Sequence, residues 1–224
     1  METIKRKAEK VQLYSPSCIN KKTFDSFHPL KYNYATMTER DRLIEIIRTR
    51  SFQYSEQPVY PLSSGAMSRF YFDMKKTVSS GEAQVLIGKL VFEKIKETGL
   101  RIDAIGGLTM GADPIAYATA HYSYYAKSPI EAFVIRKEPK AHGLQLQVEG
   151  NVKAGDNVII VDDVVTTGAS TIKAIDIARK HGLSVKAVIV FVDRGEQNGR
   201  QNIESLGLPV YDIFTIQDFI SIKI

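Results

Sequence analysis

The sequence is poor in cysteine, since Cys18 is the single residue of this type. One cysteine excludes an internal disulfide and any zinc site built on cysteines, and it suits a reducing cytosol, so we predict a cytoplasmic location. Long apolar runs are lacking too, and no stretch of about 20 apolar residues is present to cross a membrane. The first residues include the charged Glu2, Lys5 and Arg6 and lack the apolar core of a secretory signal, so no membrane partner is expected.

Charge of either sign is not concentrated in one part of the chain. Lys and Arg number 30 against 25 Asp and Glu, a net charge of +5, and no basic stripe with interleaved aromatic residues is present. We therefore expect a small anionic substrate rather than a nucleic acid. The 224 residues, 44% of them hydrophobic, suffice for one sizeable core. We predict a domain over residues 37–224, preceded by an N-terminal extension over residues 1–36 whose weak pattern indicates no role.

Residues 158–171 are the most informative stretch. Four apolar residues are followed by Asp162 and Asp163 and then by a polar turn at 166–170. Such an apolar run is typical of a buried parallel strand, and open α/β sheets bind ligands at the carboxyl ends of their strands. The turn brings hydroxyls and unpaired N–H groups to a helix N-terminus, which favours a phosphate. A plain polar strand end is the alternative, whereas a P-loop NTPase would need a G-x-x-x-x-G-K-S/T loop that the chain lacks.

The segment at 161–170 resembles the phosphoribosyl pyrophosphate (PRPP) motif of type I phosphoribosyltransferases; its sequence is Val-Asp-Asp-Val-Val-Thr-Thr-Gly-Ala-Ser. The resemblance implies an α/β fold with a central, mostly parallel sheet flanked by helices and a small N-terminal hood, formed mainly by residues 37–75 plus a C-terminal part. It implies that the two carboxylates hold the ribose hydroxyls and that the turn holds the 5′-phosphate. The implied PRPP-binding residues of the motif are Asp162, Asp163, Val164, Val165, Thr166, Thr167, Gly168, Ala169 and Ser170.

A charged loop follows the strand pattern at 131–135. Its cationic residues are Arg136, Lys137, Lys140 and His142. Most such runs are solvated loops, but charged loops between core strands are often functional lids. The sequence pattern of this loop, Arg-Lys-Glu-x-Lys-x-His-Gly, resembles the catalytic loop of orotate phosphoribosyltransferases. That resemblance implies that all four residues bind PRPP, that Lys140 and His142 act in catalysis with Asp162 and Asp163, and that closure of residues 136–150 excludes water.

The base-binding residues are predicted from two further segments. Leu-Ser-Ser-Gly at 62–65, Ser68 and Tyr-Phe-Asp at 71–73 resemble the substrate segment of the same family, which implies that Tyr71 and Phe72 line an orotate pocket. Plain core packing is the alternative for these two rings. Arg194 follows a buried strand and can clamp a carboxylate, although a surface arginine is also possible; the resemblance assigns it and Thr166 to orotate. Two departures weaken the likeness, since Ser63 and Met110 stand where many members carry Lys.

Strand and helix patterns alternate along the chain, which predicts a parallel, right-handed α/β sheet. We expect helices beginning at Thr38, with Asp41 in a capping box, at Ser79, with Glu82 in another, and at Asp113, as N-cap before Pro114. Val85, Leu86, Leu90, Val91 and Ile95 are the expected buried stripe of the second helix. The Gly-rich loop at 106–114 lets backbone approach an anion.

Together these patterns predict that the protein transfers the phosphoribosyl group of PRPP to orotate in pyrimidine biosynthesis. The resemblance also implies Mg²⁺, carried by PRPP and contacted at most by Asp162 or Asp163, and a homodimer with active sites shared between subunits. Two other functions stay open: a phosphoribosyltransferase for a purine or uracil, and a non-catalytic PRPP-sensing regulator of the same fold. No second catalytic domain, such as a decarboxylase, fits in this length.

Overall fold

The computed structural model describes residues 37–62, 65–138 and 147–220. The predicted extension at 1–36 lies outside the described residues, as do Ser63, Lys140 and His142. Residues 38–224 make up one compact unit. Within its described part, no helix is long and apolar enough to cross a membrane.

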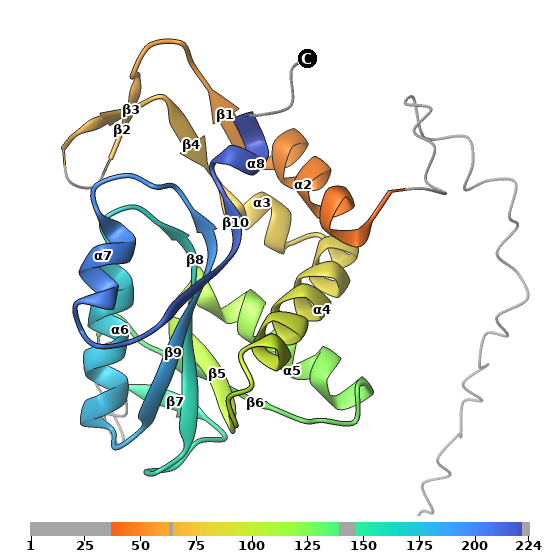
Figure 1. Cartoon of the computed structure of the whole chain (residues 1–224), viewed down its shortest axis with the longest axis vertical. Coiled ribbons are helices and arrows are strands. Elements are labelled where there is room, and N and C mark those ends of the chain that lie inside the picture. The colour runs from red at the N-terminus through yellow and green to blue at the C-terminus, as the bar shows by residue number, and fades with distance from the viewer. Residues whose placement is uncertain (1–36, 63–64, 139–146, 221–224) are drawn as a thin grey trace, which may run out of the picture. The chain divides into compact units, whose positions relative to one another are not determined.

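A six-stranded sheet forms the centre of this unit (Figure 1). Its strands are β5 (Ala104–Leu108), β6 (Glu131–Ile135), β7 (Val148–Gly150), β8 (Asn157–Val165), β9 (Ser184–Asp193) and β10 (Val210–Thr215). The order is β10-β9-β8-β5-β6-β7, and every neighbouring pair is parallel except β6 with β7. The predicted, mostly parallel sheet is therefore confirmed. Strands β8 and β9 are apolar along most of their length because both of their faces are covered.

Helices cover the two faces of the sheet, and each face has its own apolar cluster. Helices α4 (Gly81–Glu97) and α5 (Ala112–Tyr125) lie on one face, over Ile159, Ile189 and Phe191. Helices α6 (Ala169–Lys180) and α7 (Gly199–Glu204) lie on the other, over residues such as Ile160 and Val190. Successive residues of a strand point to opposite faces, so one apolar strand contributes to both clusters.

Short elements form a hood beside the carboxyl ends of the strands (Figure 1). They are α2 (Glu39–Arg50), β1 (Phe52–Tyr54), β2 (Tyr60–Pro61), β3 (Met67–Ser68), β4 (Phe70–Phe72), α3 (Met74–Val78) and, from the C-terminal part, α8 (Gln217–Ile220). Strand β1 pairs with β4 and β2 with β3, both antiparallel. Phe219 of α8 packs on Phe52 and Phe72, with ring centroids 5.6 and 5.3 Å apart. Arg40 joins α2 to the same end of the chain through Asp218, at 2.9 Å, and the carbonyl of Ile213.

The helix starts confirm one expected cap and correct two. The Thr38 hydroxyl accepts a hydrogen bond from the Asp41 amide at 3.1 Å, which is the N-cap bond of the predicted box, and donates to the Asp41 carboxylate at 2.6 Å. The prediction of a capping box formed by Ser79 and Glu82 was wrong, because α4 begins at Gly81 and the side chain of its N-cap residue makes no capping hydrogen bond. Asp113 was also wrong as an N-cap, since α5 begins one residue before it.

The expected buried stripe of α4 needs one correction as well. Val85 is 67% exposed, whereas Ile87 and Phe92 are buried along with the expected Val91 and Ile95. Leu86 and Leu90 pack against the core only in part. The cause is that α4 lies on α5 so closely that a Cβ on Gly88 would meet the Ala118 carbonyl oxygen at 2.3 Å, and this contact sets the rotation of α4.

Candidate active site

The two adjacent carboxylates lie at the carboxyl end of β8, as predicted, and they differ in their surroundings. Asp162 is 6% exposed, and its Oδ2 accepts hydrogen bonds from the hydroxyls of Ser170 at 2.8 Å and Thr171 at 2.6 Å. Its Oδ1 accepts from the Asp163 amide at 3.1 Å. Asp163 is less buried, and within the described part of the chain its side chain accepts from the Val164 amide at 2.9 Å. Asp162 is thus fixed by the protein, while Asp163 keeps acceptor capacity for a ligand.

Burial controls the protonation of this pair. Loss of hydration raises the pKa of Asp162, although hydrogen bonds from Thr171 and Ser170 act against the rise. Burial, followed by the charge of Asp162, raises the pKa of Asp163 from its usual 3.8 to about 7. Both carboxyl groups therefore hold a proton more readily than an exposed aspartate does, and a cation bound beside them would favour their ionised forms. Such a perturbed pair at a strand end is typical of a functional site.

The turn at residues 166–170, which follows β8 and is called the phosphate turn below, has the geometry of an anion site. Gly168 has a left-handed φ of +78°, and a Cβ there would meet the Gly199 carbonyl oxygen at 2.8 Å. Helix α6 begins at the next residue, and its 12 residues direct a helix N-terminus at the turn. Asn202 of α7 donates to the Thr167 carbonyl at 2.9 Å and holds the turn from outside. The N-terminus of α6 at this turn thus favours a phosphate.

The loop between β5 and α5 reaches the carboxylates from the neighbouring strand. Gly111 lies so close to Asp163 that an added Cβ would be 2.5 Å from Oδ1. The Thr109 amide donates to the Ile135 carbonyl at 2.8 Å, and its hydroxyl donates to Asp113 at 2.6 Å. Met110 is 68% exposed at the tip of this loop, where it contributes no cation. Backbone, rather than a charged side chain, is what this loop presents to a ligand.

Two of the four predicted loop cations lie in the described residues, directly after β6. Arg136 is paired with Glu149 on β7. Lys137 is exposed, and its carbonyl accepts a hydrogen bond from Lys173 Nζ on α6 at 2.9 Å. Lys173 also lies 3.7 Å from the carboxylate of Glu138. The base of the charged loop is therefore attached to the helix whose N-terminus faces the phosphate turn.

Arg194 is buried, not a surface residue. Its amide donates to the Val165 carbonyl at 3.2 Å, which brings it beside the end of β8. Its Nη2 donates to Ser68 Oγ and to the Phe70 carbonyl, each at 2.8 Å, and lies 2.7 Å from Glu196 Oε2. Its Nε is buried with no partner among the described residues. Burial lowers the pKa of the guanidinium, and Glu196 opposes the change.

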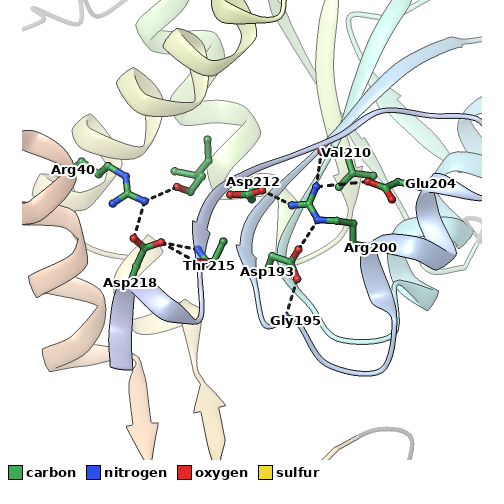
Figure 2. A network of polar contacts seen from close by, with 10 residues as sticks. Arg40, Asp193, Gly195, Arg200, Glu204, Val210, Asp212, Thr215 and Asp218 are labelled. Atoms are coloured by element: carbon green, nitrogen blue, oxygen red, sulfur yellow. Dashed lines mark hydrogen bonds and ion pairs between the residues drawn. The ribbon is translucent and has the colours of Figure 1, made fainter. Parts of the chain in front are cut away.

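A polar network fixes the strand end that carries this arginine (Figure 2). Arg200 on α7 donates from Nε to Asp193 Oδ2 at 2.9 Å and from Nη1 to the Val210 carbonyl at 2.7 Å, and it also pairs with Asp212. The other oxygen of Asp193 accepts from the Gly195 amide at 2.9 Å. The residues on both sides of Arg194 are thus held in place.

Comparison with known proteins shows the family of this chain. A family model described as a phosphoribosyl transferase domain matches residues 79–221. An orotate phosphoribosyltransferase of Aquifex aeolicus is 46% identical over 184 residues, which are 82% of this chain and 99% of the relative. The chain belongs to the orotate phosphoribosyltransferase family. A further relative of that name, from Rhodopseudomonas palustris, is 40% identical over 187 residues, 82% of this chain and 97% of its own.

Solved structures of orotate phosphoribosyltransferases share the fold. That of Mycobacterium tuberculosis in complex with Fe(III) dicitrate has a TM-score of 0.69 and 33% identity, covering 82% of this chain and 99% of its own. Its complex with PRPP has a TM-score of 0.65 and 31% identity, covering 81% and 99%. An adenine phosphoribosyltransferase of Leishmania tarentolae, 13% identical with a TM-score of 0.55, shares the fold alone. The type I fold predicted from the PRPP motif is confirmed.

The two aromatic residues that the family resemblance assigned to orotate point to opposite faces of β4. Tyr71 is 40% exposed and stacks on Tyr60 with centroids 5.8 Å apart. Phe72 is buried in the core against Phe52 and Phe219. Core packing therefore accounts for Phe72, and Tyr71 is the ring with a free face for a ligand.

Several residues of this site have no signal in the sequence that would find them. They are Glu196 beside Arg194, Asn202 behind the phosphate turn, Lys173 at the base of the loop, and Arg200 in the network of Figure 2. Lys173 and Asn202 act through contacts with segments distant in the chain, and Glu196 does so through Ser68. Arg200 contacts Asp193 and Asp212. Charged and amide residues on exposed helices are common, so their types alone indicate no role.

Proposed function

We propose that this member of the family transfers the phosphoribosyl group of PRPP to orotate, giving orotidine 5′-monophosphate and pyrophosphate in pyrimidine biosynthesis. The observation that carries the proposal is the carboxylate pair at the end of β8 with a phosphate turn directly after it. A substrate with a vicinal diol and a 5′-phosphate matches both parts at once, because carboxylates accept from hydroxyls and a helix N-terminus favours a phosphate.

The PRPP-binding residues are those of the motif at 162–170. Asp163, with acceptor capacity left, takes the ribose hydroxyls, and Asp162 holds Ser170 and Thr171 so that the start of α6 stays in position. Negative charge beside the ribose also favours the positive charge that develops at C1 as pyrophosphate leaves. Fixing the ribose at both ends orients C1 toward the base and lowers the barrier by several kcal/mol, of the order of 7 in well-aligned systems.

Mg²⁺ is the proposed cofactor, and the residues present fit it. Among the described residues no cluster of three or more potential ligands exists. Mg²⁺ is commonly bound by one or two carboxylates together with substrate phosphates and water, so a single uncommitted carboxylate is enough. Asp163 is that carboxylate. When bound, the metal would supply charge that neutralises the pyrophosphate.

The loop cations are proposed to stabilise the leaving group. Arg136 and Lys137 lie after β6 beside the Thr109–Gly111 loop, and Lys140 and His142 follow them in the chain. Cationic donors directed at the oxygen where charge develops lower the barrier to its departure. Arg136 is neutralised by Glu149 in this structure, so Lys137, Lys140 and His142 are the cations that we assign first to pyrophosphate.

Orotate is assigned to the space beside Arg194, with Thr166 and Tyr71 as further contacts. A carboxylate base requires a cation, and Arg194 is a buried one at the end of β9. Glu196 pairs with this arginine. We propose that the orotate carboxylate takes over part of this pairing, so Glu196 competes with the substrate.

The decisive variants are Arg194→Ala and Glu196→Gln. If Arg194 binds orotate, its loss raises the KM for orotate by about 10- to 100-fold, the equivalent of one charge-assisted hydrogen bond or more, with the KM for PRPP unchanged. Removing the competing charge at Glu196 lowers the KM for orotate. If Arg194 only supports the hood, both variants would weaken the enzyme alike, and unchanged orotate kinetics in Arg194→Ala would favour a purine or uracil as the base.

A homodimer with shared sites and a cytoplasmic location complete the proposal. The dimer rests on the resemblance of the loop at 136–143, and α4 and α5 offer an exposed apolar surface that suits it. Val85, Tyr117 and Tyr125 are 67, 56 and 69% exposed there and line a groove of about 510 Å³. Sedimentation of the full chain as a dimer is the expected result. The location rests on the single cysteine.

A further inference from the structure

A second cavity lies in the hood, on the β1–β4 ribbon and beside α8. Its volume is about 470 Å³, within the range of small-molecule sites. We call it the hood groove. Its lining residues are Arg48, Phe52, Tyr54, Arg69, Phe70, Phe219 and Ile220. Only Phe70 is shared with the candidate active site, through its backbone carbonyl.

The floor of the hood groove is a series of aromatic rings. Phe70 lies between Phe52 and Tyr54, with centroid separations of 6.2 and 5.8 Å and interplanar angles of 20° and 27°. The strand register explains this, because Tyr54 pairs with Phe70 and residues paired across a ribbon share one face. Tyr54 remains 55% exposed at the end of the series. An exposed ring continuing a stack is a platform for another planar ring.

Two arginines border this platform. Within the described part of the chain, neither Arg48 nor Arg69 has an acidic partner, whereas Arg40, Arg42 and Arg200 are all paired. Unpaired guanidinium groups offer forked donors that match a phosphate or carboxylate. The groove thus combines an aromatic surface with positive charge, and its complement is a planar ring that carries an anion.

We propose that the hood groove binds a nucleoside 5′-monophosphate, with the base on Tyr54 and Phe70 and the phosphate between Arg48 and Arg69. Phe70 connects this site to the candidate base pocket, because its ring lines the groove while its carbonyl accepts the bond from Arg194 Nη2. A nucleotide here acts on the strand that holds Arg194. This regulatory consequence rests on the proposed function, but binding itself does not.

The test is calorimetric titration of the full chain with uridine 5′-monophosphate. Saturating ribose 5-phosphate is present throughout, so that the turn at 166–170 is filled and only a separate site is measured. One site per chain is expected. Arg48→Gln and Arg69→Gln should each weaken binding about 10-fold or more, as loss of a charge-assisted bond does. Arg50→Gln is the control. Arg50 is exposed and lies on α2, as Arg48 does, but it does not line the groove, so this variant should leave nucleotide affinity unchanged.

Parallel titrations with uridine and with inorganic phosphate separate the two halves of the site. Weaker binding of both than of the nucleotide supports the proposal. Absence of nucleotide binding in these mixtures, where ribose 5-phosphate fills the turn at 166–170, overturns the proposal, and so does binding that Arg69→Gln leaves intact. Phosphate binding as tight as the nucleotide's also overturns it, because the groove is then a simple anion site. These titrations measure binding and no turnover, so a negative result leaves the proposed reaction unaffected. An effect of the nucleotide on orotate turnover does not support the hood groove unless binding there is also measured.

Discussion

Asp163→Asn should make the protein more stable and less able to bind PRPP. The amide is nearly the same size as the carboxyl group and can still accept the bond from the Val164 amide, so the backbone at the end of β8 is preserved. What changes is the charge. Burial and the neighbouring Asp162 raise the pKa of Asp163 to about 7, which means that folding disfavours the ionised carboxylate.

The size of the effect follows from linkage between protonation and folding. A folded-state pKa of about 7 against the usual 3.8 corresponds to roughly 4 kcal/mol of stability lost once Asp163 is ionised. Because the Asp163 side chain is not fully shielded from solvent and the neighbouring Asp162 carboxyl group affects its ionisation, we expect about 1–3 kcal/mol. A carboxyl group whose pKa is raised by folding does not lower the free energy of unfolding at pH values below its unfolded-state pKa. It lowers that free energy by the full amount at pH values above its folded-state pKa. The advantage of the variant should therefore be absent near pH 4 and grow until about pH 7.

Urea unfolding of both proteins at several pH values between 4 and 8 measures this difference. Asp176→Asn, an exposed aspartate on α6, is the matched control and should show no pH-dependent gain. PRPP binding by Asp163→Asn should weaken about 10- to 100-fold, since a hydrogen bond to a charged acceptor is lost. An equal gain at pH 5 and pH 8, or no gain at pH 8, would refute the reasoning that burial strains this carboxylate.

Two further substitutions test the charged loop. Lys140→Ala should lower kcat about 100-fold with an unchanged unfolding midpoint, since a cation at the leaving group is lost; a silent substitution would instead support a PRPP-sensing protein without catalysis. Lys173→Met removes the bond to the Lys137 carbonyl and should lower kcat several-fold with the KM for orotate unchanged, whereas Lys180→Met, also on the exposed face of α6, should have no effect. Equal losses in both lysine variants of α6 would mean that general surface charge matters, not the position of the loop.

The fold could be predicted largely because buried parallel strands are continuous apolar runs. Strand β6 has the expected bounds, β8 contains the expected apolar run before Asp162, and β9 is the buried strand expected before Arg194. Strand β7 was not predicted, since it has three residues at a sheet edge and only Val148 is buried. Helix α7 was also missed. It has six residues, follows Asn198 with a φ of +55°, and is held by contacts that Arg200 and neighbouring residues make elsewhere in the fold.

The site could be predicted where its chemistry lies within one segment. Asp162, Ser170 and Thr171 are close in the chain, and the structure brings them together. The surroundings of Arg194 could not be predicted in this way, because Ser68 and Glu196 meet across 128 positions of sequence. Residue types indicate a site when they are close together in the sequence, at a turn or a strand end. They do not indicate it when only the tertiary fold brings them together.

The central claim is that this chain uses orotate as the base, and one measurement tests it most directly. The purified full chain is mixed with PRPP, Mg²⁺ and orotate, and the absorbance of orotate is followed with time, with uracil and hypoxanthine in parallel mixtures. The account predicts loss of orotate that requires PRPP and releases one pyrophosphate for each orotate consumed. Orotate that persists while uracil or hypoxanthine is converted would contradict it.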